Sequence, residues 1–149
     1  MDRTTRGLLA GIIAGIAMNA WNLFDYYFLH ITEIRFLDWL SVLLTWTKPE
    51  NGFQTATALV LQTIIWDGFL GIVFALLVIP ITSRGIVYKS TFYSVFLWFI
   101  FKAVVNLYRV PILSAPQPYT GRLSNLMAVF IWGIVMGLVL KKLEEKTES

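Results

Sequence analysis

Four long apolar stretches constrain this chain more than any other feature of its sequence. They cover residues 7–29, 57–81, 88–110 and 123–140, and each contains about 18 to 25 residues. An α-helix of that length crosses about 30 Å of hydrocarbon, because it rises about 1.5 Å per residue. None of the stretches alternates apolar and polar residues as a membrane β-strand does. The sequence therefore predicts an all-α, polytopic membrane protein with a four-transmembrane-helix bundle.

The composition supports this fold class. Charged residues make up 14% of the chain and hydrophobic residues 57%, whereas about a quarter of the residues in a soluble domain are charged. We expect one membrane domain over residues 1–149. The first stretch also resembles a signal peptide in layout, but it continues through Trp21 and Phe24, and three further stretches follow. We therefore interpret it as a retained first span.

Basic residues in the loops predict the orientation. With four spans, both termini and the segment between the second and third spans share one side of the membrane. The basic residues of that side are Arg3, Arg6, Arg84, Lys89, Lys141, Lys142 and Lys146. Those of the other side are Arg35, Lys48 and Arg122, with Arg109 near its edge. Because Lys and Arg collect in cytoplasmic loops, we expect cytoplasmic N- and C-termini. The same rule explains the net charge of +3, and no Lys/Arg run predicts nucleic acid as a partner.

The segment at residues 36–46 is apolar but too short to cross a membrane. Asp38, Ser41 and Thr45 share one face of a helix, with Lys48 following on that face, and the leucines lie opposite. This pattern predicts an amphipathic helix in the outer membrane interface, with Trp39 and Trp46 at the depth of the lipid headgroups. A helix packed as a lid over the mouth of the bundle is a second, compatible interpretation.

Polar side chains inside the spans are the candidate site. The first span carries Asn19, Asn22 and Asp25, and the third carries Lys102, Asn106 and Arg109; each set shares one helix face. The second span carries Gln62 and Asp67, and the fourth carries Asn125. Charged groups at a helix centre cost about 2.5–3.5 kcal/mol each on insertion scales, so they should face inward and pair.

Depth in the membrane suggests which charges pair. Asp67 and Lys102 fall near the midplane, and Asp25, Asn106 and Arg109 fall in the outer half. We therefore expect Asp67 to pair with Lys102 and Asp25 with Arg109, and the amides to supply the remaining hydrogen bonds. The pairs would either fasten the bundle or surround a polar cavity for an ion, a proton or a small polar solute. A third interpretation is that the helix of a membrane-protein partner completes the cluster.

Glycines at helical spacing predict close helix contacts. Gly7, Gly11 and Gly15 form a double GxxxG pattern in the first span, and Gly133 and Gly137 form another in the fourth. GxxxG allows two helix backbones to approach closely. We expect these glycines to pack inside the bundle, with contact between two copies of the chain as the alternative.

The sequence predicts neither a catalytic nor a metal site. It has no cysteine, and the motifs of nucleotide-binding loops, serine hydrolases and zinc proteases are missing. His30 is the single histidine, and a metal site needs three or four ligands. No cofactor is expected. A non-enzymatic membrane component or accessory subunit is the first expectation, a small permease or channel the second, and a membrane-embedded enzyme the third.

The layout resembles that of small four-span membrane proteins of Gram-positive bacteria, the YqhR-like proteins. The features that carry the resemblance are the glycine-spaced first span, the segment Leu37-Asp38-Trp39 and the segment Leu97-Trp98-Phe99. The resemblance implies a location in the bacterial inner (cytoplasmic) membrane, with the lipid bilayer as the surroundings. It implies no activity and no site residue.

Overall fold

A computed structural model of the chain describes residues 2–77, 85–110, 112–114 and 116–148. Within these ranges the structure is all-helical, with 83% of the residues in helices and no strand. The helices are α1 (Arg3–Phe24), η1 (Asp25–Leu29), α2 (Phe36–Thr45), α3 (Gly52–Val60), η2 (Leu61–Asp67), α4 (Gly68–Leu77), α5 (Ile86–Leu107) and α6 (Tyr119–Glu148). The two η elements are π-helical turns.

Four helices are long and apolar enough to cross a membrane, as the sequence predicts. They are Arg3–Leu29, Gly52–Leu77, Ile86–Leu107 and Tyr119–Lys146. The second consists of α3, η2 and α4 in one continuous run, called here the α3–α4 helix. All four begin before the predicted residues. The predicted end of the second span at Ile81, together with Arg84, lies outside the described residues.

The third helix ends three residues before the predicted end of its span near Val110. α5 ends at Leu107, because Tyr108 leaves the helical conformation and Arg109 has a left-handed backbone with a φ of 50°. Leu107, Tyr108 and Arg109 are all exposed. The chain therefore leaves the helix before the last polar residue that had been assigned to this span.

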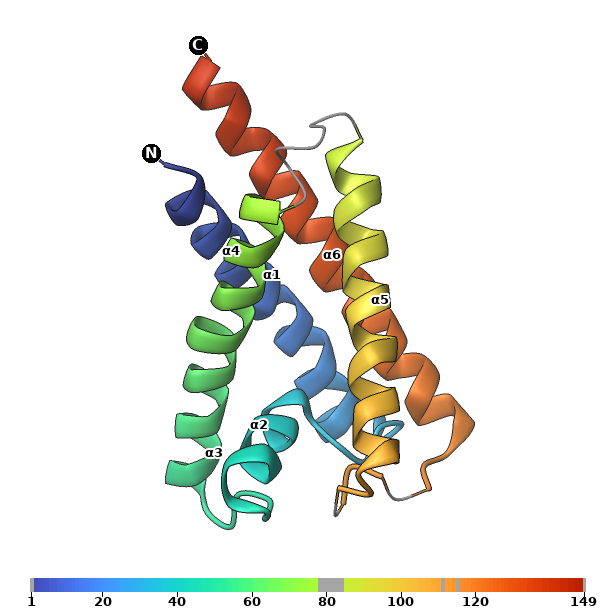
Figure 1. Cartoon of the computed structure of the whole chain (residues 1–149). Helices are drawn as coiled ribbons and strands as arrows, with labels where there is room; N and C mark the ends of the chain where they lie inside the picture. The colour runs from blue at the N-terminus through green and yellow to red at the C-terminus, as the bar shows by residue number, and fades with distance from the viewer. Residues whose placement is uncertain (1, 78–84, 111, 115, 149) are drawn as a thin grey trace.

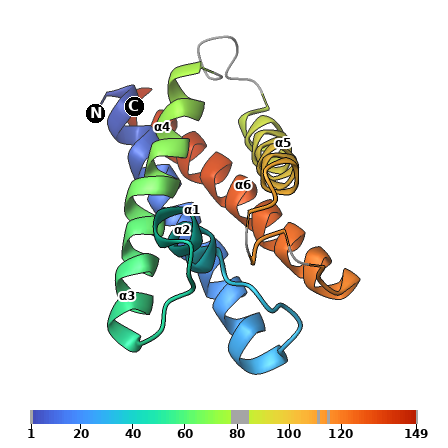
Figure 2. The ribbon, with the colours of Figure 1, turned by 60° about the horizontal axis from the view of Figure 1, so that its bottom comes forward.

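The helices form a bundle whose two ends differ (Figure 1). Both termini lie at one end, called here the terminal end. α2 and the segment between α5 and α6 lie at the other, called here the α2 end. α1 packs along α4 and along α6, and α5 packs along α6. In Figures 1 and 2, α5 and the α3–α4 helix stand on opposite sides of α2. Only 17% of the most apolar part of α5 is buried, against 50% for α6.

The glycines lie where two helices touch. At Gly11 an added Cβ would overlap the carbonyl oxygen of Asp67, and at Gly7 it would lie 2.7 Å from the carbonyl oxygen of Gly71. At Gly137 it would lie 2.6 Å from the Cα of Val87 in α5. Contacts this short leave no room for a side chain, so both glycine faces are covered within the chain. The structure therefore uses them for internal packing of α1 on the α3–α4 helix and of α6 on α5.

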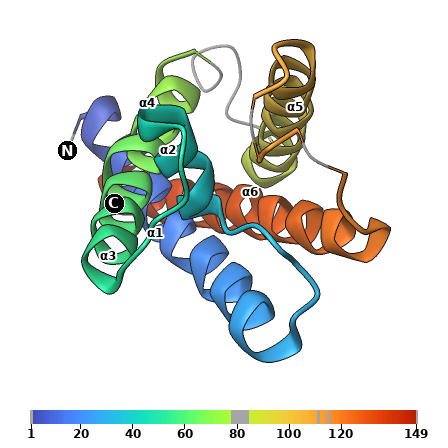
Figure 3. The same cartoon turned by 90° about the horizontal axis from the view of Figure 1, so that it is seen from below.

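The short helix predicted at residues 36–46 is confirmed as α2, Phe36–Thr45. Seen from the α2 end, it lies across the middle of the bundle between α3 and α5 (Figure 3). Leu37 and Val42 are buried, and Val42 joins Val105 of α5 in a small apolar cluster. Asp38, which the sequence places on the polar face, is also fully buried. These contacts agree with the interpretation of α2 as a lid.

Candidate functional site

The three polar side chains predicted to share a face of the first span do so, and all are buried. Asn19 is 4% exposed, Asn22 is 1% exposed and Asp25 is completely buried. They do not form one cluster, however. Asn19 contacts the α3–α4 helix, whereas Asn22 and Asp25 contact α6. The reason is that α1 crosses between these two neighbours, so successive turns of the same face meet different helices.

The first group, called here the Asp67 cluster, contains Asn19, Gln62, Thr63 and Asp67. The Nδ2 of Asn19 donates to Gln62 Oε1 at 2.7 Å and to Thr63 Oγ1 at 2.9 Å. Gln62 Nε2 in turn donates to Asp67 Oδ2 at 2.9 Å. The carboxyl of Asp67 packs against Gly15, where any side chain would overlap it. The absent side chain of Gly15 thus creates the space that the carboxyl occupies.

The π-helical turn η2 explains how Gln62 and Asp67 meet. In an α-helix, residues five apart lie about 140° apart around the axis, since each residue turns the chain by about 100°. In a π-helix the backbone bonds join residues i and i+5, which brings such residues onto one side. Gln62 and Asp67 are five apart and are the second and last residues of η2. The turn therefore aligns the amide with the carboxyl.

The second group, called here the Asp25 cluster, contains Asn22, Asp25, Thr32, Ser124 and Asn125. The carboxyl of Asp25 accepts hydrogen bonds from the Ser124 hydroxyl and from the backbone N–H of Ile31, the latter at 3.1 Å. Asn125 Oδ1 accepts from Asn22 Nδ2 at 3.4 Å and from Thr32 Oγ1 at 3.1 Å. The cluster joins α1, the segment before α2 and the first turns of α6.

Neither predicted ion pair forms in the described part of the chain. Asp67 is bonded to Gln62 and Asp25 to Ser124. Lys102 is half-buried, with its Nζ 5.4 Å from the ring centre of Trp39 and 6.0 Å from that of Trp98. The cause is the position of α5, which packs on α6 and leaves the α3–α4 helix at a distance.

The predicted inward face of the third span is also wrong. Asn106 and Arg109 are exposed, and Val105 is the buried residue at this end of α5. Arg109 lies beyond the end of the helix, so helical spacing no longer applies to it. Of the three polar residues predicted on that face, Lys102 alone approaches other parts of the bundle.

A pocket of about 330 Å³ occupies the space between the α3–α4 helix and α5. α1, α2 and α6 contribute to its wall. Leu43 and Leu44 line it and are at least half exposed, so the pocket opens to the surface beside α2. The lining residues are Met18, Phe36, Trp39, Leu40, Leu43, Leu44, Gln62, Trp66, Asp67, Leu70, Ser94, Leu97, Trp98, Phe101, Val129 and Trp132.

The pocket wall is apolar, with a few polar groups. Gln62 and Asp67 bring the Asp67 cluster to the wall, and Ser94 is the remaining polar side chain. Trp132 lines the pocket with a buried indole N–H that has no hydrogen-bond partner in the described structure. Tyr93 bridges the two sides beside the pocket, since its hydroxyl donates to the carbonyl oxygen of Leu70 at 3.0 Å. An apolar cavity with few polar groups is the usual form of a small-molecule site.

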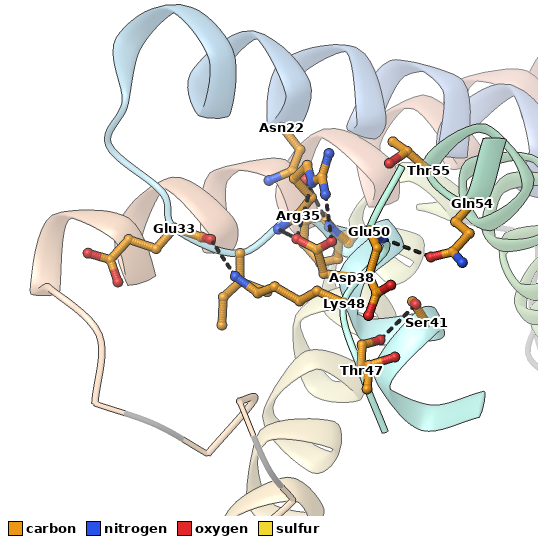
Figure 4. Close-up of polar contacts among 12 residues, drawn as sticks. Asn22, Glu33, Arg35, Asp38, Ser41, Thr47, Lys48, Glu50, Gln54 and Thr55 are labelled. Carbon is orange, nitrogen blue, oxygen red and sulfur yellow. Dashed lines mark hydrogen bonds and ion pairs between the residues drawn. The ribbon is translucent and has the colours of Figure 1, made fainter. Parts of the chain in front are cut away.

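The α2 lid is fastened at its start by charged and polar contacts (Figure 4). Arg35 and Asp38 form an ion pair at 2.9 Å, and Arg35 also donates to the Tyr27 hydroxyl at 2.6 Å. Burial disfavours the charge of Arg35, but the hydrogen bond and negative charge of Asp38 outweigh this effect and raise the pKa of Arg35. The backbone N–H of Phe36 donates to Asn22 Oδ1 at 2.9 Å, which ties the lid to α1.

Several members of the site have no signal in the sequence. Thr63 and Ser124 are ordinary helix residues, since hydroxyls in apolar helices often bond to their own backbone. Trp39, which the sequence predicts at the depth of the headgroups, also lines the pocket and is half-buried. The other three tryptophans of the wall, Trp66, Trp98 and Trp132, come from three different helices, so only the tertiary structure brings them together.

The described residues contain no group of three or more His, Cys, Asp or Glu side chains that could hold a metal ion. Comparison of the chain with protein-family models, with curated proteins and with solved structures finds no match. The functional conclusion therefore depends on the pocket and the two polar clusters.

Proposed function

We propose that this chain is a non-enzymatic, multi-pass membrane protein that holds one hydrocarbon chain of a lipid in its pocket. The observation that carries the proposal is the apolar, tryptophan-lined cavity of about 330 Å³ between the α3–α4 helix and α5. The proposal includes insertion of the four long helices in the bacterial inner membrane, with the terminal end in the cytoplasm. The excess of basic residues at the terminal end supports this orientation.

The size of the pocket suits a flexible apolar chain. The cavity of about 330 Å³ is about twice the engineered apolar cavity of 150 Å³ that binds benzene. A hydrocarbon chain can follow such a space, because it is thin and its bonds rotate.

The chemistry of the wall favours a hydrocarbon over a polar solute. The aromatic and aliphatic side chains of the wall offer dispersion contacts and few hydrogen bonds. The polar groups that a permease or channel would use are bonded to one another in the Asp67 and Asp25 clusters. A channel for an ion, a proton or a small polar solute therefore has less support than a lipid site.

Filling the pocket with a larger side chain tests the proposal. Leu97 lines the pocket, and Leu97→Trp adds volume inside it. We expect this variant to lose at least about tenfold in affinity for dioleoyl phosphatidylcholine, a loss of about 1.4 kcal/mol. The measurement is a lipid titration of delipidated protein in detergent, with bound lipid counted by native mass spectrometry.

Ile100→Trp is the matched control. Ile100 lies three residues further along α5, is 40% exposed and does not line the pocket. It should bind lipid as the wild type does. Equal lipid binding by Leu97→Trp, Ile100→Trp and wild-type protein, with all three folded by thermal unfolding, would rule out the pocket as a lipid site.

A further inference from the structure

A cation lies beside the α2 end of the pocket. Lys102 Nζ lies over the rings of Trp39 and Trp98, and both rings belong to the pocket wall. No carboxylate in the described parts of the chain pairs with Lys102. A half-buried ammonium group is costly when it has no counter-charge, and contact with aromatic rings offsets only part of that cost. The position therefore favours an anion.

Lys102 differs from the other basic group buried at the α2 end. Arg35 is buried and forms an ion pair with Asp38 at 2.9 Å. Lys102 has no such counter-charge among the residues that the structure describes, and its Nζ faces two indole rings instead.

We infer that Lys102 binds the anionic group of a lipid whose hydrocarbon chain occupies the pocket. The inference rests on the proposed function, because it assigns the headgroup of the same ligand. Trp39 and Trp98 connect the two parts, since each contacts Lys102 and also lines the pocket. A chain in the pocket therefore places its polar end at Lys102, with the opening beside α2 as the route of entry.

The anionic group is a phosphate or a carboxylate. Lys offers a compact positive charge with three donors, which suits either oxyanion. Lys102 lies five residues before the end of α5 at Leu107, so it is nearer the α2 end than the midplane depth that the sequence predicts. In the proposed orientation this end faces the outer surface, where phospholipid phosphates and fatty-acid carboxylates are found. Basic residues near a membrane surface attract anionic lipids by about 1 kcal/mol each, which is about a fivefold change in affinity per residue.

The test compares lipids of equal chain and different charge. Delipidated protein is titrated with dioleoyl phosphatidylglycerol, with dioleoyl phosphatidylcholine and with oleate, and bound lipid is counted by native mass spectrometry. We expect wild-type protein to prefer phosphatidylglycerol or oleate over phosphatidylcholine by about fivefold or more. Whichever anionic lipid is preferred identifies the phosphate or the carboxylate as the bound group.

Three variants test whether Lys102 causes the preference for anionic lipid. Lys102→Gln should abolish most of this preference, and Lys102→Arg should retain it. Arg109→Gln removes an exposed cation from the same end of the molecule and should leave it unchanged. Lys102→Gln should unfold at the same temperature as delipidated wild type or higher, because no ion pair is lost.

The outcomes separate this inference from the proposed function. Equal binding of charged and zwitterionic lipids overturns the inference, and so does a preference that survives Lys102→Gln. If Leu97→Trp still blocks binding in those cases, the pocket remains a site for hydrocarbon chains. If Leu97→Trp has no effect on any of the lipids, the proposed function itself fails.

Discussion

Asp67 shows how a single buried carboxyl is accommodated without a cation among the described residues. The amides around it point in one direction: Asn19 donates to Gln62, and Gln62 donates to Asp67. Successive donors of this kind polarise one another and stabilise the acceptor at the end of the chain. The opposite end is left incomplete, since Asn19 Oδ1 is buried without a partner in the described structure.

Neutralising Asp67 tests whether its carboxyl is held by the amides or by the ion pair with Lys102 that the sequence predicts. Asp67→Asn keeps an acceptor for Gln62 Nε2 and leaves no cation without its partner. We therefore expect the free energy of unfolding of this variant to stay within about 0.5 kcal/mol of wild type. Loss of a buried ion pair would instead cost about 3–5 kcal/mol. Asp67→Leu removes the acceptor and should cost about 1–3 kcal/mol. Unfolding by denaturant in mixed micelles measures all three proteins, and a loss above 3 kcal/mol for Asp67→Asn would contradict the amide arrangement.

The residue patterns predict which side chains turn inward on α1 but not what they bond. Helical spacing alone places Asn19, Asn22 and Asp25 on one face. Their partners depend on how α1 crosses the α3–α4 helix and α6, which a single sequence does not encode locally. The contact of Gln62 with Asp67 depends further on a π-helical turn, and the residues of that segment do not predict such a turn.

At the scale of the helices, small residues decide which neighbours come close. α1 presents Gly11 to the backbone of the α3–α4 helix, and α6 presents Gly137 to the backbone of α5. Without a hydrophobic driving force between helices in lipid, such packing and hydrogen bonds supply much of the attraction. The GxxxG pattern predicts close contacts of this kind from spacing alone, although it does not name the partner helix.

Adding one methyl group at these contacts should separate the helices. At Gly11 the new Cβ would overlap the Asp67 carbonyl oxygen and lie 3.1 Å from the Gly68 Cα. Backbone atoms cannot rotate away, so we expect Gly11→Ala to lower the free energy of unfolding by about 1–3 kcal/mol. The measurement is unfolding of the purified protein in mixed micelles.

Gly52→Ala is the matched control for that change. Gly52 begins α3, and nothing lies within 4 Å of the position that its Cβ would take. This variant should be neutral or slightly more stable, because Ala has a higher helix propensity than Gly by up to about 1 kcal/mol. A comparable loss in both variants would mean that close packing of α1 is not the cause.

At the scale of the whole molecule, the displacement of α5 creates the pocket. α5 packs along α6, while the α3–α4 helix packs along α1, and α2 spans the gap between them at one end. Tyr93 is the link across this gap that donates a hydrogen bond, to the Leu70 carbonyl oxygen. The rings of Trp66 and Phe101 also meet across it, with centres 5.3 Å apart. The space that remains has an apolar wall, which is the condition for a site that takes up a hydrocarbon chain.

The proposed membrane topology can be tested with single cysteines, because the chain contains none. Thr47→Cys and Thr120→Cys lie at the α2 end, and Glu145→Cys lies at the terminal end; all three positions are exposed. A membrane-impermeant maleimide added to intact cells should label the first two completely. It should label Glu145→Cys only after the membrane is permeabilised. Labelling of Glu145→Cys in intact cells would reverse the proposed orientation.

The sequence by itself determines the helical spans, the short helix over residues 36–46 and the small-residue contact faces. These features are local: a run of apolar residues, a helical period or a glycine every fourth residue has the same physical meaning wherever the helix packs. The ends of the spans are less certain, as the early end of α5 at Leu107 shows. Spacing alone does not reveal that Tyr108 leaves the helix.

Only the tertiary structure decides the partners of the polar groups and the existence of the pocket. The expected pairing of Asp67 with Lys102 assumes that helices carrying opposite charges at equal depth lie side by side. The structure instead places a cavity between them, satisfies Asp67 with Gln62 and leaves Lys102 beside two tryptophans. The depth of a residue depends only on its own helix, whereas the choice of neighbouring helices depends on the packing of all four. The site forms between neighbouring helices, so the sequence of one helix does not predict it.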